Sequence, residues 1–258
     1  MKRTITELLA RGVGAWLRWL PLSARIKTLM RLIVISTREI SPEETLKSLF
    51  ELENHLYALE GKATIEYGEG IHTKHRHINY HRFFIENIKP GERVLDIGCG
   101  NGILSHDIVN NIRDVRVTGV ELDGTKIDFA REHYQDPKLS FIQGDALKEL
   151  PKGTFEVIVL SNVLEHIRER VEFLRMVVHH TKPKRIIIRV PCFERDWRVP
   201  LKKELGVDYR LDSTHYIEYT PEEFFQELQD AGLKSTLTVF RWGEIWSVVE
   251  VSDEKTDD

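Results

Sequence analysis

The alternation of short apolar strands with helical stretches after residue 90 most constrains the fold of this chain. Segments rich in Val, Ile and Leu occur at 93–97, 115–121, 139–143, 155–160 and 185–190, and helical stretches separate them at 103–112, 126–134 and 165–180. Parallel strands need crossover helices, so this order predicts a mostly parallel α/β sheet that is covered on both faces. A helix at 221–231 and two last strands at 235–241 and 245–251 complete a doubly wound, seven-stranded sheet.

Composition excludes several other classes of protein. Of the 258 residues, 41% are hydrophobic and 30% are charged, which describes a globular chain and excludes a fibrous or largely disordered one. The two cysteines, Cys99 and Cys192, are too few for a disulfide scaffold or a four-thiolate zinc site, and they suit a reducing cytoplasm. The formal net charge of −4 gives no general attraction to nucleic acid, so no nucleic-acid partner is expected.

The first 40 residues differ in charge from the rest of the chain. They hold eight basic and two acidic side chains, a net charge of +6, which leaves −10 on the remainder. Apolar residues at three- and four-residue spacing predict a helix that ends at Pro21, a second with Ser23 as its N-cap, and a third that begins at Ser41 and runs through Leu56. Charged residues interrupt any secretory signal, and no apolar run approaches the roughly 18 residues of a membrane span.

Three interpretations of these basic helices stay open. They could pack against the core or a second subunit, lie on an anionic membrane surface, or extend the substrate site. Amphipathic stripes most often face a core, so packing is favoured, and peripheral membrane contact through residues 1–40 is the alternative.

A glycine-rich turn follows the first strand of the core. Gly98, Gly100 and Gly102 form a G-x-G-x-G pattern, in which missing side chains let the backbone approach a ligand closely. A dinucleotide fingerprint would need glycine at the position of Ile103. Asp96 stands two residues before the first glycine, where a pyrophosphate would be repelled and a cationic cofactor attracted.

Polar residues also end the next three strands. Glu121 can accept both hydrogen bonds of a ribose diol, and Asp145, followed by Ala146, can accept from an adenine amino group. The fourth strand ends in Ser161 to His166, which opens the next helical stretch. S-adenosylmethionine suits this set because it has no phosphate and carries a sulfonium and an ammonium group.

These four motifs, in this order, resemble the class I S-adenosylmethionine-dependent methyltransferases, in the branch of the quinone-biosynthesis and type 11 or 12 enzymes. The resemblance covers about residues 91–233, and the stretch 215–225 is similar to the C-terminal part of that branch. It implies a Rossmann-like methyltransferase fold and S-adenosylmethionine as cofactor. One departure is Lys182 to Arg185, where the family often has Pro-Gly-Gly. The residues implied to bind the cofactor are Asp96, Gly98, Cys99, Gly100, Glu121, Leu122, Asp145, Ala146 and Asn162.

Two histidines are candidate catalytic bases. His166 follows the fourth strand and His215 lies beyond the fifth, so both fall on the substrate side, and histidine is the usual base for a hydroxyl acceptor near neutral pH. The alternative is that His166 caps or packs and that His215 is a surface residue. The four histidines of 68–81 have no acidic or cysteine partner at ligand spacing, so no metal is predicted.

Two segments are candidate substrate contacts. Residues 63–82 have little periodicity and predict a long loop, either a lid with Lys74 or Arg76 on the methionine carboxylate and Tyr80 facing the acceptor, or an ordinary surface loop. The insert 191–220, with Asp196 and Arg210, could bind a sugar or a phosphorylated glycan carrier, or be a solvated cover.

The predicted organisation is a helical extension (1–62), a lid segment (63–90), a cofactor-binding domain (91–251) and a disordered acidic tail (252–258). The predicted function is methyl transfer to oxygen of a small-molecule, glycan or lipid-carrier acceptor in the cytoplasm. A regulatory S-adenosylmethionine-binding module and an RNA methyltransferase are the alternatives.

Overall fold

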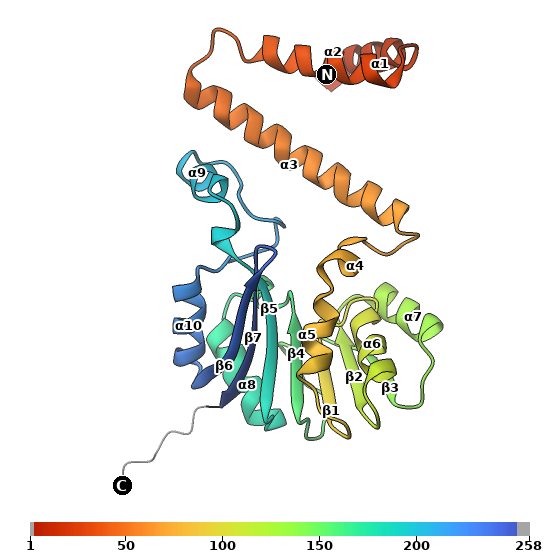
Figure 1. The fold of residues 1–258 in the computed structure, drawn as a ribbon, viewed down its shortest axis with the longest axis vertical. Coiled ribbons are helices and arrows are strands. Elements are labelled where there is room, and N and C mark those ends of the chain that lie inside the picture. The colour runs from red at the N-terminus through yellow and green to blue at the C-terminus, as the bar shows by residue number, and fades with distance from the viewer. Residues whose placement is uncertain (1–2, 252–258) are drawn as a thin grey trace. The chain divides into compact units, whose positions relative to one another are not determined.

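The computed structural model describes residues 3–251 (Figure 1), so the predicted acidic tail lies outside the described residues. The chain divides into two compact units, one up to Leu56 and one from Tyr57. The helix α3 (Pro42–Tyr67) crosses this boundary. Each unit is described by itself.

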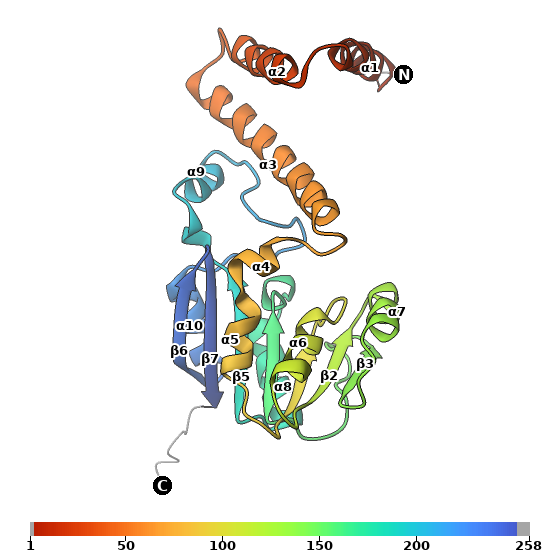
Figure 2. The same ribbon diagram turned by 45° about the vertical axis from the view of Figure 1, so that its right-hand side comes forward.

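The second unit is built on one seven-stranded sheet in the order β3-β2-β1-β4-β5-β7-β6. The strands β1 to β5 pair in parallel, and β7 runs antiparallel to both of its neighbours. This confirms the predicted doubly wound α/β sheet (Figure 2). The strand bounds are β1 Arg93–Ile97, β2 Arg116–Glu121, β3 Leu139–Gln143, β4 Val157–Ser161, β5 Arg185–Pro191, β6 Leu233–Arg241 and β7 Glu244–Val251.

Helices cover both faces of the sheet because side chains alternate along the strands. On β5, Ile186 and Ile188 face the layer of α8 (Arg170–Thr181) and α10 (Pro221–Asp230), whereas Ile187 faces the layer of α5 (Tyr80–Glu86) and α6 (Ile103–Asn111). A smaller cluster packs α7 (Gly124–His133) near β3. The central strands are therefore buried on both sides, as their continuous apolar sequences predict.

The N-terminal unit is helical, with α1 (Arg3–Arg18), α2 (Leu22–Ser36) and the start of α3. The predicted breaks at Pro21 and Ser41 are confirmed. The Ser41 hydroxyl accepts from the Glu44 amide at 3.1 Å, and the Glu44 carboxylate accepts from the Ser41 amide at 3.2 Å, which caps α3 reciprocally. The predicted cap at Ser23 is wrong, because Pro21 holds the N-cap position and Ser23 lies inside α2.

The prediction of a long loop over 63–82 is wrong. The helix α3 continues to Tyr67 rather than ending near Leu56, and α4 (Lys74–Ile78) is followed at once by α5. Asn79, with φ of +52°, forms the left-handed junction between the two short helices. Aromatic side chains of α5 are buried in the core, and this packing holds a segment that has no clear periodicity of its own.

The insert after β5 also contains local structure, a 3-10 turn η2 (Phe193–Arg195) and a short helix α9 (Arg198–Glu204). Across the whole described range, 3–251, the helices lack the combination of length and apolar character that crossing a bilayer requires.

Candidate functional site

The glycine turn joins β1 to α6, and its three glycines have different roles. All three have positive φ values, which only glycine adopts easily. A Cβ on Gly98 would lie 2.7 Å from Val163, and one on Gly102 would lie 2.5 Å from Phe141, so the fold itself needs these two glycines. A Cβ on Gly100 would meet nothing within 4 Å. The turn is thus open at Gly100, where a ligand can approach the backbone.

Two carboxylates flank this turn. Asp96 is 1% exposed and accepts from the Ser105 hydroxyl at 2.6 Å. Burial, with a smaller effect of the Glu121 charge, raises the pKa of Asp96 to about 7. Glu121 accepts from the Gly100 amide and from the Asp123 amide, both at 3.0 Å, and so holds the turn in place. An acidic turn of this kind suits a cationic cofactor without phosphate.

The other predicted cofactor residues lie beside this turn or at the end of β3. Leu122 is 66% exposed and is free to pack on a ligand. Asp145 is half-buried, pairs with Lys148 at 2.9 Å and accepts from the Leu147 amide at 3.1 Å. Ala146 is also half-buried. Cys99 is buried against Gly119 of β2, and burial raises the pKa of its thiol, so it packs within the sheet.

Polar atoms without partners gather after β4. Asn162, with φ of +57°, donates from its backbone to the Arg189 carbonyl at 2.8 Å, but its side-chain oxygen is buried and unbonded. Glu165, in the 3-10 turn η1 (Leu164–His166), is fully buried, and neither carboxylate oxygen has a partner. Burial raises the pKa of Glu165 to about 8. Because buried polar groups are normally satisfied, these atoms point to a ligand site.

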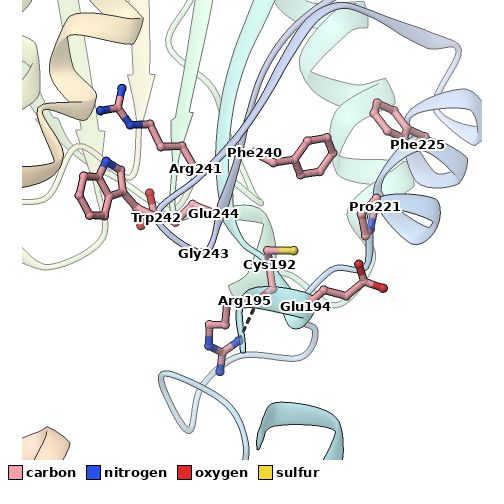
Figure 3. A pocket seen from close by; sticks show the side chains of 10 residues that line it. All are labelled: Cys192, Glu194, Arg195, Pro221, Phe225, Phe240, Arg241, Trp242, Gly243 and Glu244. Atoms are coloured by element: carbon pink, nitrogen blue, oxygen red, sulfur yellow. Dashed lines mark hydrogen bonds between the residues drawn. The ribbon is translucent and has the colours of Figure 1, made fainter. Parts of the chain in front are cut away.

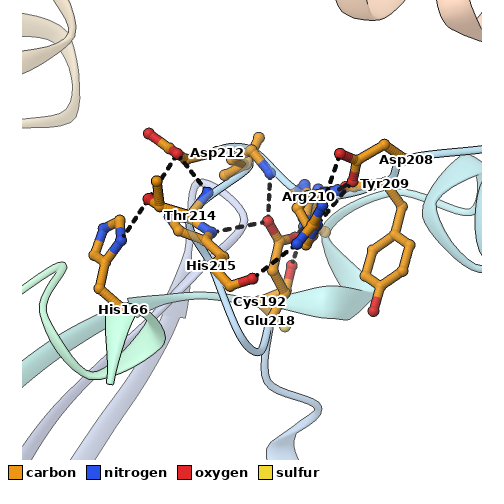
Figure 4. Close-up of polar contacts among 11 residues, drawn as sticks. His166, Cys192, Asp208, Tyr209, Arg210, Asp212, Thr214, His215 and Glu218 are labelled. Atoms are coloured by element: carbon orange, nitrogen blue, oxygen red, sulfur yellow. Dashed lines mark hydrogen bonds and ion pairs between the residues drawn. The ribbon is translucent and has the colours of Figure 1, made fainter. Parts of the chain in front are cut away.

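The structure brings His166 and His215 together, with their ring centroids 4.6 Å apart (Figure 4). The Thr214 hydroxyl donates to Asp212 at 2.7 Å and lies 2.8 Å from His166 Nδ1. Because the Thr214 hydroxyl proton is directed to Asp212, the Thr214 oxygen accepts a hydrogen bond from His166 Nδ1–H. The lone pair of the His166 ring therefore lies on Nε2. Burial, and then the neighbouring His215, lower the pKa of His166 and favour the neutral ring.

His215 is 6% exposed, so the alternative of a surface histidine is wrong. Its Nδ1 lies 3.2 Å from the buried Glu218 carboxylate, which accepts a hydrogen bond from Nδ1–H. The lone pair of the His215 ring therefore also lies on Nε2. One ligand atom from each of Glu165, His166 and His215 lies within 4.8 Å of the others. Two imidazoles and a carboxylate, with the imidazoles held by outer hydrogen bonds, could hold a divalent cation.

The histidine-rich segment is joined to the core through Tyr80, which is buried rather than open to an acceptor. Its hydroxyl lies 2.9 Å from His75 Nδ1, and the Arg189 guanidinium lies 3.7 Å from the centre of its ring. Burial raises the pKa of Tyr80 to about 12. His81 Nδ1 lies 2.5 Å from Asp107 of α6, so these side chains fasten α4 and α5 to the domain.

The two lid cations have different surroundings. Arg76 is exposed, with its guanidinium 5.6 Å from the ring of Tyr67. The structure therefore does not bring Arg76 to the glycine turn. Lys74 is half-buried; its burial and the charge of Arg189 lower its pKa, and the charges of Glu244 and Glu165 act on it in the opposite direction. Of the two cations, Lys74 is thus the one whose charge interacts with Glu165.

The charged residues of the insert mostly pair with each other. Asp196 accepts from Arg198 at 2.6 Å, which suits a solvated cover. Arg210 pairs with Asp208 at 2.9 Å and also donates to the His215 carbonyl at 3.1 Å, so it helps to hold His215 (Figure 4). Arg195 pairs with the buried Glu218.

A cavity of about 520 Å³ lies at the ends of β5 and of the β6–β7 hairpin (Figure 3). Cys192, Phe240, Trp242 and Glu244 are among its lining residues. None of the predicted cofactor or catalytic residues is part of this described lining. The cavity therefore lies beside the site and gives no information on the cofactor.

Sequence reasoning missed four site residues, which are Glu165, Arg189, Thr214 and Glu218. All four stand within the quoted motifs or next to them, so the sequence shows that these residue types are present there. The partners of these residues, and the burial of Glu165, Arg189 and Glu218, were not visible, because they depend on how the insert folds over the end of β4. The backbone amide of Tyr216 donates to the Glu165 carbonyl at 2.7 Å, which shows this contact.

Comparisons with known proteins agree with this geometry. Residues 94–184 match the methyltransferase domain family. The chain is 29% identical over 168 residues to phosphoethanolamine N-methyltransferase 3 of Arabidopsis thaliana, which covers 64% of this chain and 33% of that protein. It is 27% identical over 158 residues to the ubiquinone biosynthesis O-methyltransferase of Rhodopseudomonas palustris, covering 58% of this chain and 61% of that protein. The chain thus spans about a third of the plant relative and about three fifths of the bacterial one.

Solved structures share the fold. The mitomycin 7-O-methyltransferase aligns with a TM-score of 0.57 and 18% identity, covering 77% of this chain and 60% of that one. The magnesium protoporphyrin IX methyltransferase of Synechocystis, solved with S-adenosylhomocysteine, aligns with a TM-score of 0.54 and 17% identity, covering 68% and 84%.

The sheet order, the acidic glycine turn and the matched domain define a Rossmann-like domain whose cofactor is S-adenosylmethionine. Residues 94–184 form a methyltransferase domain of the class I S-adenosylmethionine-dependent type, and the chain is similar to the quinone-biosynthesis O-methyltransferases.

Proposed function

We propose that this chain transfers a methyl group to a hydroxyl of a small-molecule, glycan or lipid-carrier acceptor. The observation that carries the proposal is the group of His166, His215 and unpartnered Glu165 at the carboxyl end of β4, on the same edge of the sheet as the glycine turn. The relatives named above include both O- and N-methyltransferases, so the acceptor atom belongs to the proposal.

The cofactor side of the site is formed by chain segments that are already in place. When bound, S-adenosylmethionine supplies an activated methyl group on a sulfonium. Gly100 gives access to the backbone, Glu121 would hold the ribose, and Asp145 with Ala146 would bind the adenine. Orientation of two reactants can supply roughly 7 to 11 kcal/mol of the barrier to such a reaction, so positioning is the main task of these residues.

His166 is the proposed base on the acceptor side. Asp212 and Thr214 fix its tautomer so that Nε2 is the proton acceptor, and its lowered pKa keeps it neutral. His215 supports it from the insert, where Arg210 and Glu218 hold the backbone and ring of His215. An acceptor hydroxyl would lose its proton to His166 as the methyl group is transferred.

The acceptor is proposed to be small because the insert that carries His215 also covers Glu165. Ion pairs within this insert use its arginines, such as Arg210 with Asp208, rather than leaving a basic groove for nucleic acid. The positive charge of the chain is concentrated in residues 1–40.

Methyl transfer from radiolabelled S-adenosylmethionine to a panel of phenolic, sugar, lipid-linked, amine and RNA acceptors tests this proposal. We expect transfer to a hydroxyl acceptor, and a turnover about 100- to 10,000-fold lower in His166→Ala, since that is the usual contribution of a general base. Binding of S-adenosylhomocysteine should be retained. The control is His180→Ala, which removes an exposed histidine of α8.

Equal turnover in His166→Ala, His215→Ala and the wild type would remove the base assignment. Loss of turnover on chelation by EDTA, with recovery on adding zinc or magnesium, would assign Glu165, His166 and His215 to a cation instead. Cofactor binding without transfer to any acceptor would favour a regulatory module, and transfer to RNA alone would favour an RNA methyltransferase.

A further inference from the structure

Within the N-terminal unit, the helices α1 and α2 leave apolar surface uncovered. Among the described side chains between Glu7 and Leu49, none is buried, and Phe50 is the first that is. Trp19 is 89% exposed, Leu22 69% and Met30 61%. Isolated helices gain little stability in water, so an apolar surface of this extent requires an occupant.

Most apolar side chains of each helix lie on a different face from the basic ones, except that Val34 and Ile35 of α2 line a pocket together with Arg31 and Arg38. At 3.6 residues per turn, Val13 and Trp16 of α1 lie on the side opposite to Arg11 and Arg18. On α2, the residues 22, 26, 29 and 33 share one face, and the residues 27 and 31, both basic, lie opposite to it. Such a separation is typical of helices that lie in a membrane surface.

Arg25 joins the two helices. Its guanidinium donates to the Leu20 carbonyl at 2.8 Å and to the Arg18 carbonyl at 2.7 Å, which satisfies backbone acceptors at the end of α1. The break at Pro21 is therefore a fixed turn, and the two apolar faces belong to one helical pair.

We propose that α1 and α2 lie in the surface of an anionic phospholipid bilayer, with their apolar faces among the acyl chains. The net charge of +6 on residues 1–40 is attracted to anionic headgroups. A second copy of the same surface carries the same net charge of +6, so the two copies would repel each other. Trp16 and Trp19 are residues that favour the boundary between headgroups and acyl chains. Long Arg and Lys side chains on the other face reach back to the headgroups.

Sedimentation of the full chain with vesicles tests this proposal. The vesicles are an equimolar mixture of phosphatidylcholine and phosphatidylglycerol, and pure phosphatidylcholine is the comparison. We expect binding to the mixture that weakens with salt, and at least about tenfold weaker binding for the double variant Trp16→Gln, Leu29→Gln, which removes two apolar anchors. Neutralising Arg11, Lys27 and Arg31 to Gln should weaken binding by about fivefold for each residue.

The matched control is the double variant Ala10→Gln, Thr28→Gln, which adds the same side chains away from the apolar faces and should bind as the wild type does. An unchanged thermal shift with S-adenosylhomocysteine in every variant verifies that the methyltransferase domain is intact. Full recovery of the wild type in the supernatant would overturn the proposal, as would equal binding by the apolar variant and its control. Self-association in the ultracentrifuge that the apolar variant abolishes, without vesicle binding, would assign the surface to a second copy.

Discussion

Glu165 is fully buried at the end of β4, and both of its carboxylate oxygens lack partners. Burial raises its pKa from the usual 4.5 to about 8, so the carboxyl carries a proton at neutral pH. A folded pKa above the unfolded one means that the folded state binds the proton more tightly. The free energy of unfolding is therefore highest below the unfolded pKa and falls as pH rises toward about 8.

This sign gives a prediction for Glu165→Gln. The amide cannot ionise, so the variant should gain stability over the wild type as pH rises from about 5 to about 8, and the difference should be smallest at the acidic end. Thermal unfolding in EDTA measures it, with about 2 to 4 °C expected for each kcal/mol in a chain of this size. The exposed Glu172→Gln is the control. A difference that shrinks with rising pH would contradict the burial argument.

The same residue shows what sequence can and cannot reveal. The glycines and Glu121 could be predicted because their spacing after strands carries the information. The burial of Glu165 could not, since it depends on residues 212–219 folding back onto η1, more than 40 positions along the chain. The tautomer of His166 depends on the same fold, through Thr214.

Among the secondary-structure elements, β5 and β7 are held together by more than their backbone ladder. Arg189 of β5 donates twice to Glu244 of β7, at 2.7 and 2.5 Å, and both side chains are buried. The Trp246 indole also donates to Glu244 at 2.8 Å, and Tyr80 of α5 lies against the guanidinium. This network links three elements beside the site.

Removing one partner should therefore be costly. Glu244→Ala leaves the buried Arg189 charge without its carboxylate, and we expect a loss of about 3 to 5 kcal/mol in the free energy of unfolding. The double variant Arg189→Met, Glu244→Leu removes both charges and should lose clearly less. Urea unfolding of the three proteins measures this. If the single variant were as stable as the wild type, the pair would not be a structural link.

The strands and their mostly parallel pairing were predictable because each strand is an apolar run between helical stretches, and crossover helices impose parallel pairing. The short helices α4 and α5 were not, because their histidine-rich sequence has no apolar stripe. They are held by tertiary contacts such as His81 with Asp107, which join residues 26 positions apart.

Across the whole molecule, the carboxyl ends of β1, β2, β3 and β4 bring the predicted cofactor residues to one edge of the sheet. The order of these motifs was sufficient to predict the class of protein and its cofactor. The acceptor could not be predicted in the same way, because the predicted substrate segments, the insert 191–220 and residues 63–90, have conformations that depend on long-range contacts.

The central claim is that this edge binds S-adenosylmethionine through Glu121, and thermal unfolding with S-adenosylhomocysteine tests it most directly. At about 100 times Kd, binding adds about 2.7 kcal/mol, a rise of roughly 5 to 10 °C in the midpoint for a chain of this size. We predict this shift for the wild type, none for Glu121→Ala relative to its own unliganded midpoint, and none with NAD. No shift in the wild type, or a shift with NAD instead, would contradict the assignment.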